Sequence, residues 1–112
     1  MNVFFDVQGT LVSGIAPRPH AREVFLKIES LGHHVYLWSS AGSAYAARAA
    51  HLLNLEDVAY GYFGKTDTIP VTVDFVVDDQ PGIVQQYGGY EIRPFSGDPE
   101  DEELWKVVEE LG

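Results

Sequence analysis

The sequence contains no cysteine, which excludes disulfides and thiolate metal sites. Any bound metal must therefore be held by oxygen or imidazole ligands. Cationic residues are also few, since 7 Lys and Arg stand against 17 Asp and Glu, and the formal net charge is -10. Proteins that bind a nucleic-acid backbone need clustered Lys and Arg to displace its counterions. We therefore expect no such partner.

Long apolar runs are missing as well. No stretch approaches the roughly 20 apolar residues that span a bilayer. The N-terminus lacks the basic flank and small-residue cleavage site of a secretory signal. These absences predict a soluble, cytoplasmic protein that does not bind membranes. The oligomeric state is unknown from the sequence.

What the sequence does contain predicts one α/β domain over residues 1–112. The hydrophobic content of 46% is enough for a single core. Short β-branched runs alternate with longer helix-forming stretches, which indicates a three-layer, Rossmann-like fold: a mainly parallel sheet with helices on both faces. The first loop, 12–19, is too short for an inserted lid or cap domain. We expect strands at 2–6, 34–38, 58–63, 71–77 and 90–92, and helices at 19–31, 43–53, 81–87 and 99–111.

Carboxylates follow two of the predicted strands. Asp6 comes directly after the run Val3-Phe4-Phe5, and Asp78 and Asp79 end a second apolar run. Open α/β sheets bind ligands at the carboxyl ends of their strands, so we expect these acids to share one crevice. Such an oxygen-rich site suits Mg²⁺. Taken alone, Asp6 before Gly9 also fits an aspartate that caps a turn.

A hydroxyl and a lysine complete the candidate set. Ser39 ends a predicted strand just ahead of a helix, where a hydroxyl and backbone N–H groups can bind phosphate oxygens. Ser40 and Ser43 compete for this role, and capping the helix explains these serines equally well. Lys65 follows Gly61 and Gly64 in a predicted loop, from which its ammonium could reach a phosphate. A plain surface lysine is the alternative.

In chain order, this pattern resembles the haloacid dehalogenase superfamily of phosphohydrolases, in its compact branch without a cap. The resemblance implies that Asp6 is the nucleophile, which forms an aspartyl-phosphate intermediate, and that Lys65 steadies that intermediate. It implies phosphate binding by Ser39 or Ser40 beside the Gly9 turn. Mg²⁺ would be held by Asp6, the backbone carbonyl of Gln8, and Asp78 or Asp79. Capless members tend to act on large substrates, so the expected partner is a phosphorylated molecule of unknown identity, either small or macromolecular.

The sequence departs from this family at Gln8. The family's phosphatases usually have an acid at this position, two residues after the nucleophile, to protonate the leaving group and then activate water. An amide cannot do either near neutral pH. Losing general acid–base assistance typically slows a reaction about 10²- to 10⁴-fold, so we expect weak turnover. A binding or regulatory module without turnover is the main alternative, and a receiver-like domain that accepts a phosphoryl group is a third.

Overall fold

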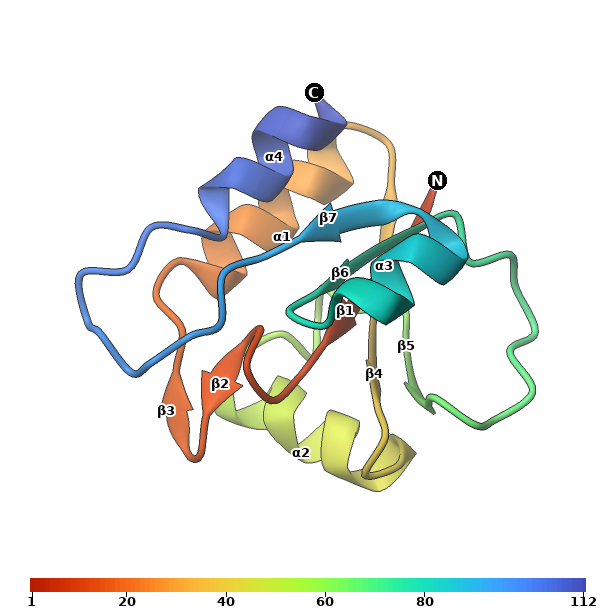
Figure 1. The fold of residues 1–112 in the computed structure, drawn as a ribbon, viewed down its shortest axis with the longest axis horizontal. Helices are drawn as coiled ribbons and strands as arrows, with labels where there is room; N and C mark the ends of the chain where they lie inside the picture. The colour runs from red at the N-terminus through yellow and green to blue at the C-terminus, as the bar shows by residue number, and fades with distance from the viewer.

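The central element of the fold is a five-stranded parallel sheet of order β5-β4-β1-β6-β7. The computed structural model describes residues 1–112. The predicted α/β class with a parallel sheet is confirmed (Figure 1). None of the helices has the length and apolar character to cross a membrane. The strands of this sheet are β1 (Asn2–Asp6), β4 (His34–Ser39), β5 (Gly61–Gly64), β6 (Phe75–Asp78) and β7 (Gly89–Glu91).

Helices cover both faces of the sheet, but unequally. Successive side chains of a strand point to opposite faces, so Val3 and Phe5 of β1 lie in the larger core cluster while Phe4 lies in the smaller. The larger cluster is completed by α1 (Ala21–Ser30), α2 (Ser43–Leu52) and α4 (Trp105–Leu111). The smaller cluster is covered by α3 (Pro81–Tyr87) and by apolar residues of the chain between β5 and β6.

The strand order fixes where a ligand site can form. Counted along the chain, the strands of the main sheet lie in the order 3-2-1-4-5, with β1 at the centre. This order matches the first five strands of a Rossmann-type sheet. The connections reverse direction between β1 and β6, and open α/β sheets bind ligands at the carboxyl ends of the strands beside such a reversal. A receiver-like domain would instead have the order 2-1-3-4-5. The topology therefore contradicts the receiver-like alternative.

A β-hairpin lies where the sequence predicts an irregular loop. Its strands are β2 (Val12–Ser13) and β3 (Ala16–Pro17), paired antiparallel and joined by Gly14 and Ile15. Gly14 has a φ of 63°. Two-residue hairpin turns need a positive φ at this position, and glycine adopts it readily. Each strand has only two residues, too short for a period-2 pattern to indicate it. This hairpin is the only element between β1 and α1.

Several predicted boundaries are wrong. Strand β5 begins at Gly61 rather than residue 58, and β6 begins at Phe75 rather than residue 71, because Val71 and Val73 pack over the smaller core cluster. Helix α4 begins at Trp105 rather than residue 99. The acids ahead of it form local turns instead, in which the Asp98 and Asp101 carboxylates accept backbone N–H bonds from residues two positions later. Aspartates that bond the backbone in this way compete with helix formation.

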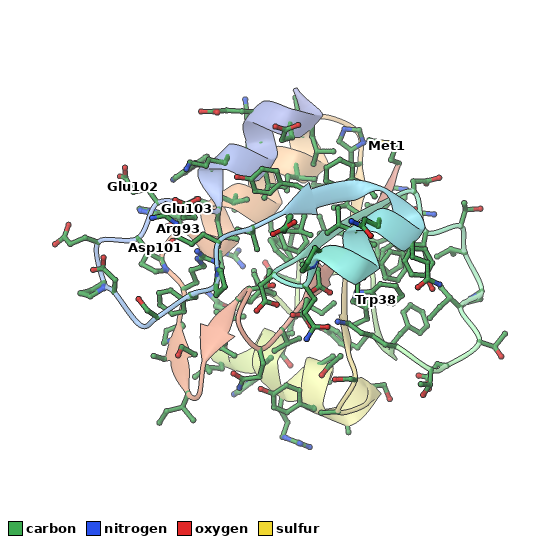
Figure 2. The ribbon with its side chains drawn as sticks, viewed as in Figure 1. Met1, Trp38, Arg93, Asp101, Glu102 and Glu103 are labelled. Atoms are coloured by element: carbon green, nitrogen blue, oxygen red, sulfur yellow. The ribbon has the colours of Figure 1, made fainter.

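A buried arginine joins parts of the chain that are far apart in the sequence. The Arg18 side chain is fully buried and pairs with Asp101 through Nε at 2.8 Å and Nη2 at 3.1 Å. It also donates to the carbonyl oxygens of Thr10 and Arg93. Figure 2 shows Arg93 and Asp101 together on the segment that leads to α4. Because Asp101 lies 83 residues from Arg18, no local spacing indicates this contact.

Arg18→Ala should lower the free energy of unfolding by about 3 to 5 kcal/mol, since it leaves Asp101 largely buried without its partner. Urea denaturation measures this loss. Arg22→Ala is the matched control, because Arg22 makes a similar two-point contact with Asp57 on the surface. Exposed pairs contribute less than about 1 kcal/mol. Equal losses in the two variants would show that Arg18 does not hold these segments together.

Candidate functional site

Carboxylates and an ammonium meet at the carboxyl end of the sheet, where the strand order reverses. The register that pairs Phe5 with Val77 places Asp6 of β1 next to Asp78 of β6. Lys65 Nζ lies 3.0 Å from Asp6 Oδ1 and 2.8 Å from Asp78 Oδ2. The structure thus brings together side chains from three separate parts of the sequence.

Lys65 reaches these acids from the far side of β4. Gly64, the last residue of β5, pairs with Ser39, the last residue of β4. The Lys65 N–H continues this pairing by donating to the Ser39 carbonyl at 3.0 Å. Strand β4 lies between β5 and β1, so only a long side chain can extend past it to Asp6. Lys65 is therefore placed by the end of a strand, not by the loop that the sequence predicts.

Asp79 lies against the turn that follows β1. Gly9 has a φ of 83°, and a Cβ at this position would overlap the Asp79 carboxylate. Glycine is thus required both for the turn and for the close approach of the two segments. Asp79 Oδ1 is buried and has no hydrogen-bond partner in the protein. An unpaired buried carboxylate oxygen is costly unless a cation or water satisfies it.

The three carboxylates could hold a divalent cation. One oxygen from each of Asp6, Asp78 and Asp79 lies within 4.8 Å of the others. Lys65 balances only one of these three charges. Asp78 already accepts from Lys65 and from the Gln80 N–H at 2.9 Å, whereas Asp79 Oδ1 has no partner. The donor set thus fits a hard cation, with Asp79 freer than Asp78 to bind it.

Burial and charge set the protonation of the site. Burial raises the pKa of Asp6 to about 6; attraction to Lys65 opposes this shift and the nearby charge of Asp78 adds to it. Burial would lower the pKa of Lys65, but its hydrogen bonds to Asp78 and Asp6 outweigh that effect and hold this pKa above its usual value. At neutral pH, Asp6 is mostly an anion beside an ammonium.

A cavity of about 600 Å³ opens beside Asp6 and Lys65, and neither Asp78 nor Asp79 lines it. Ser39 is buried, and its Oγ accepts a hydrogen bond from the Ala41 N–H at 3.0 Å, which leaves its proton free to donate. Helix α2 begins just after this loop and has no side-chain cap, so N–H groups of its first turn are available to an anion. The residues that line the cavity are Asp6, Gln8, Ser39, Ser40, Ala41, Tyr45, Lys65, Gln80 and Ile83.

Gln8 joins the site to the hairpin. Its Nε2 donates to the Gly14 carbonyl at 3.1 Å, and its Oε1 accepts from the Gly14 N–H at 3.3 Å. Nε2 also donates to the Tyr45 hydroxyl at 2.5 Å. The amide thus binds the hairpin turn and helix α2 at the edge of the cavity.

Four cavity-lining residues carry no site prediction from the sequence, namely Ala41, Tyr45, Gln80 and Ile83. A signal exists only for Tyr45, which is the sole aromatic residue of the alanine-rich helix that follows Ser39. Gln80 lies directly after Asp78 and Asp79, at the carboxyl end of β6. Ile83 lines the cavity because α3 turns it toward the site.

Searches of protein-family models, curated proteins and solved structures find no match to this chain.

Asp6→Asn should stabilise the protein at pH 7 to 8 and have little effect near pH 4. The pKa of Asp6 is about 6 in the folded state, against an ordinary value of 3.8. The folded state therefore binds this proton more tightly than the unfolded state does. The stability that this proton contributes is therefore complete below about pH 4 and is lost as pH rises through 6. The gain from asparagine at pH 8 is up to roughly 3 kcal/mol. Urea denaturation across this range measures it; a gain independent of pH would contradict the buried-charge origin.

Gln8→Glu should destabilise the hairpin. Glutamate keeps the length of the side chain but cannot donate to the Gly14 carbonyl, a loss of about 0.5 to 1.5 kcal/mol for each hydrogen bond. Thermal melting and hydrogen exchange at the Gly14 amide measure the effect. Gln85→Glu is the control, because Gln85 is exposed on α3. If both variants melt and exchange alike, the Gln8 contacts do not hold the hairpin.

Proposed function

We propose that this protein is a Mg²⁺-dependent phosphohydrolase that acts through an aspartyl-phosphate intermediate on Asp6. The observation that carries this proposal is the placement of the Asp6 carboxylate at the reversal of strand order, with Lys65 bound to both Asp6 and Asp78. The resemblance of these residues to the haloacid dehalogenase superfamily supports the same reaction. A HAD-like fold without a cap is part of this proposal.

The reaction would proceed in two displacements. A carboxylate oxygen of Asp6 attacks phosphorus, the bond from phosphorus to the leaving oxygen breaks, and the phosphoryl group is transferred to Asp6. Water then attacks the aspartyl phosphate, which releases inorganic phosphate and restores the carboxylate. Lys65 offsets charge on the transferred group, and the Ser39 hydroxyl, with Ser40 beside it, donates to phosphate oxygens.

Asp6, the Gln8 carbonyl and either Asp79 or Asp78 would hold Mg²⁺. When bound there, the ion would shield the anionic phosphate from the anionic nucleophile. The unpaired Asp79 oxygen and the excess negative charge of the site support this role.

Gln8 restricts which esters can react. Its amide is occupied by Gly14 and Tyr45 and has no proton to give to a leaving alkoxide. Turnover should therefore be fastest for esters whose leaving group needs no protonation, such as aryl phosphates. The cavity carries no cap domain, which also admits a phosphate on a large substrate.

The wild-type protein with Mg²⁺ should hydrolyse an activated aryl phosphate in multiple turnovers, and Asp6→Asn should reduce the rate at least about 10³-fold, because an amide is no nucleophile. Release of inorganic phosphate measures both rates. Asp74→Asn is the control, because Asp74 binds the Asn2 N–H at the opposite end of β1. Equal rates for Asp6→Asn and wild type would remove Asp6 from the mechanism.

A binding or regulatory module is the second candidate, and the fully engaged amide of Gln8 favours it. In that case, calorimetry would detect binding of Mg²⁺ and of phosphate, and no aryl or alkyl phosphate would be hydrolysed. Multiple turnover on any phosphate ester would exclude this candidate.

A further inference from the structure

A second, smaller cavity of about 180 Å³ lies between the hairpin and helix α2. Its walls are mainly apolar: Val12 and Ile15 come from the hairpin, and Tyr45, Ala49 and Leu52 come from α2. None of its lining residues is acidic, although the chain has a net charge of -10. An apolar group that enters it therefore meets no carboxylate.

This apolar cavity adjoins the carboxylate cavity. Tyr45 lines both cavities, and its hydroxyl is bound by Gln8, which lines the carboxylate cavity. Gln8 also binds both backbone groups of Gly14, which lines the apolar cavity. The Gln8 side chain thus holds Tyr45, which lines both cavities, and Gly14, which lines the smaller one.

Two aliphatic side chains that line the apolar cavity are exposed to solvent. Ile15 is 87% exposed at the tip of the hairpin, and Leu52 is 49% exposed at the end of α2. Neither belongs to a core cluster. The Arg48 guanidinium lies 5.9 Å from the centre of the Tyr45 ring and adds a cation to the lining of the cavity.

We propose that the apolar cavity binds the leaving group of the substrate, so that the preferred substrates are phosphate monoesters of phenols. The inference rests on the proposed function, since the phosphate itself would lie in the carboxylate cavity. The size fits, because an aliphatic cavity of about 150 Å³ accepts a benzene ring. An aryl leaving group also meets the restriction that Gln8 imposes.

Calorimetry with two stable phosphonates tests this assignment in the presence of Mg²⁺. Methylphosphonate and phenylphosphonate carry the same acid group and differ only in the apolar part. Burying the ring should make phenylphosphonate bind about tenfold more tightly to the wild type. Ile15→Ser and Leu52→Ser should each reduce this ratio by about threefold or more and leave the affinity for methylphosphonate unchanged.

Leu26→Ser is the matched control, because Leu26 is 45% exposed on α1 and lines neither cavity. It should keep the full ratio. If the wild type binds both phosphonates equally, the leaving-group assignment is wrong while the phosphate site stands. If neither phosphonate binds, the proposed function fails and the assignment fails with it. A change of oligomeric state in Ile15→Ser, seen by sedimentation velocity with the ratio unaltered, would assign this surface to contact between copies and overturn the proposal.

Discussion

The contact of Lys65 with Asp6 and Asp78 is the interaction on which the arrangement of this end of the sheet depends. Strands β1, β5 and β6 end here, and β1 and β6 place carboxylates next to each other. Burying two adjacent carboxylates is unfavourable unless a cation lies between them. The ammonium of Lys65 supplies that cation from the far side of β4. The cluster therefore links the two halves of the sheet while it keeps a net negative charge.

This remaining charge connects stability to the proposed chemistry. Burial raises the pKa of Asp6, so the ionised form that could act as a nucleophile is also the form that the fold stabilises least. Asp79, with a buried oxygen that has no partner, adds to the same imbalance. A cation bound by these acids would relieve both costs together. Functional sites commonly retain such local strain at the expense of stability.

The amide of Gln8 holds together the segments at the edge of the site. Where the resemblance leads one to expect an acid, the amide instead holds the hairpin turn at Gly14 and the hydroxyl of Tyr45. A carboxylate could not make this set of contacts, because it has no N–H to donate. The same side chain therefore binds Gly14, which lines the apolar cavity, and Tyr45, which lines both cavities.

The sequence by itself determined the parallel α/β class, the helices and the strand ends at which Asp6, Ser39 and Asp78 stand, because apolar periodicity and strand-end polarity are local properties. Only the tertiary structure decided which side chains contact one another at those strand ends. The reach of Lys65 across β4, the contact of Gly9 with Asp79 and the burial of Arg18 against Asp101 depend on strand order and on chain segments up to 83 residues apart. The hairpin was decided in the same way, because contacts with Gln8 outweigh weak local preferences, whereas the late start of α4 follows from local turns at Asp98 and Asp101. Local pattern selects the elements, whereas long-range contacts select their partners.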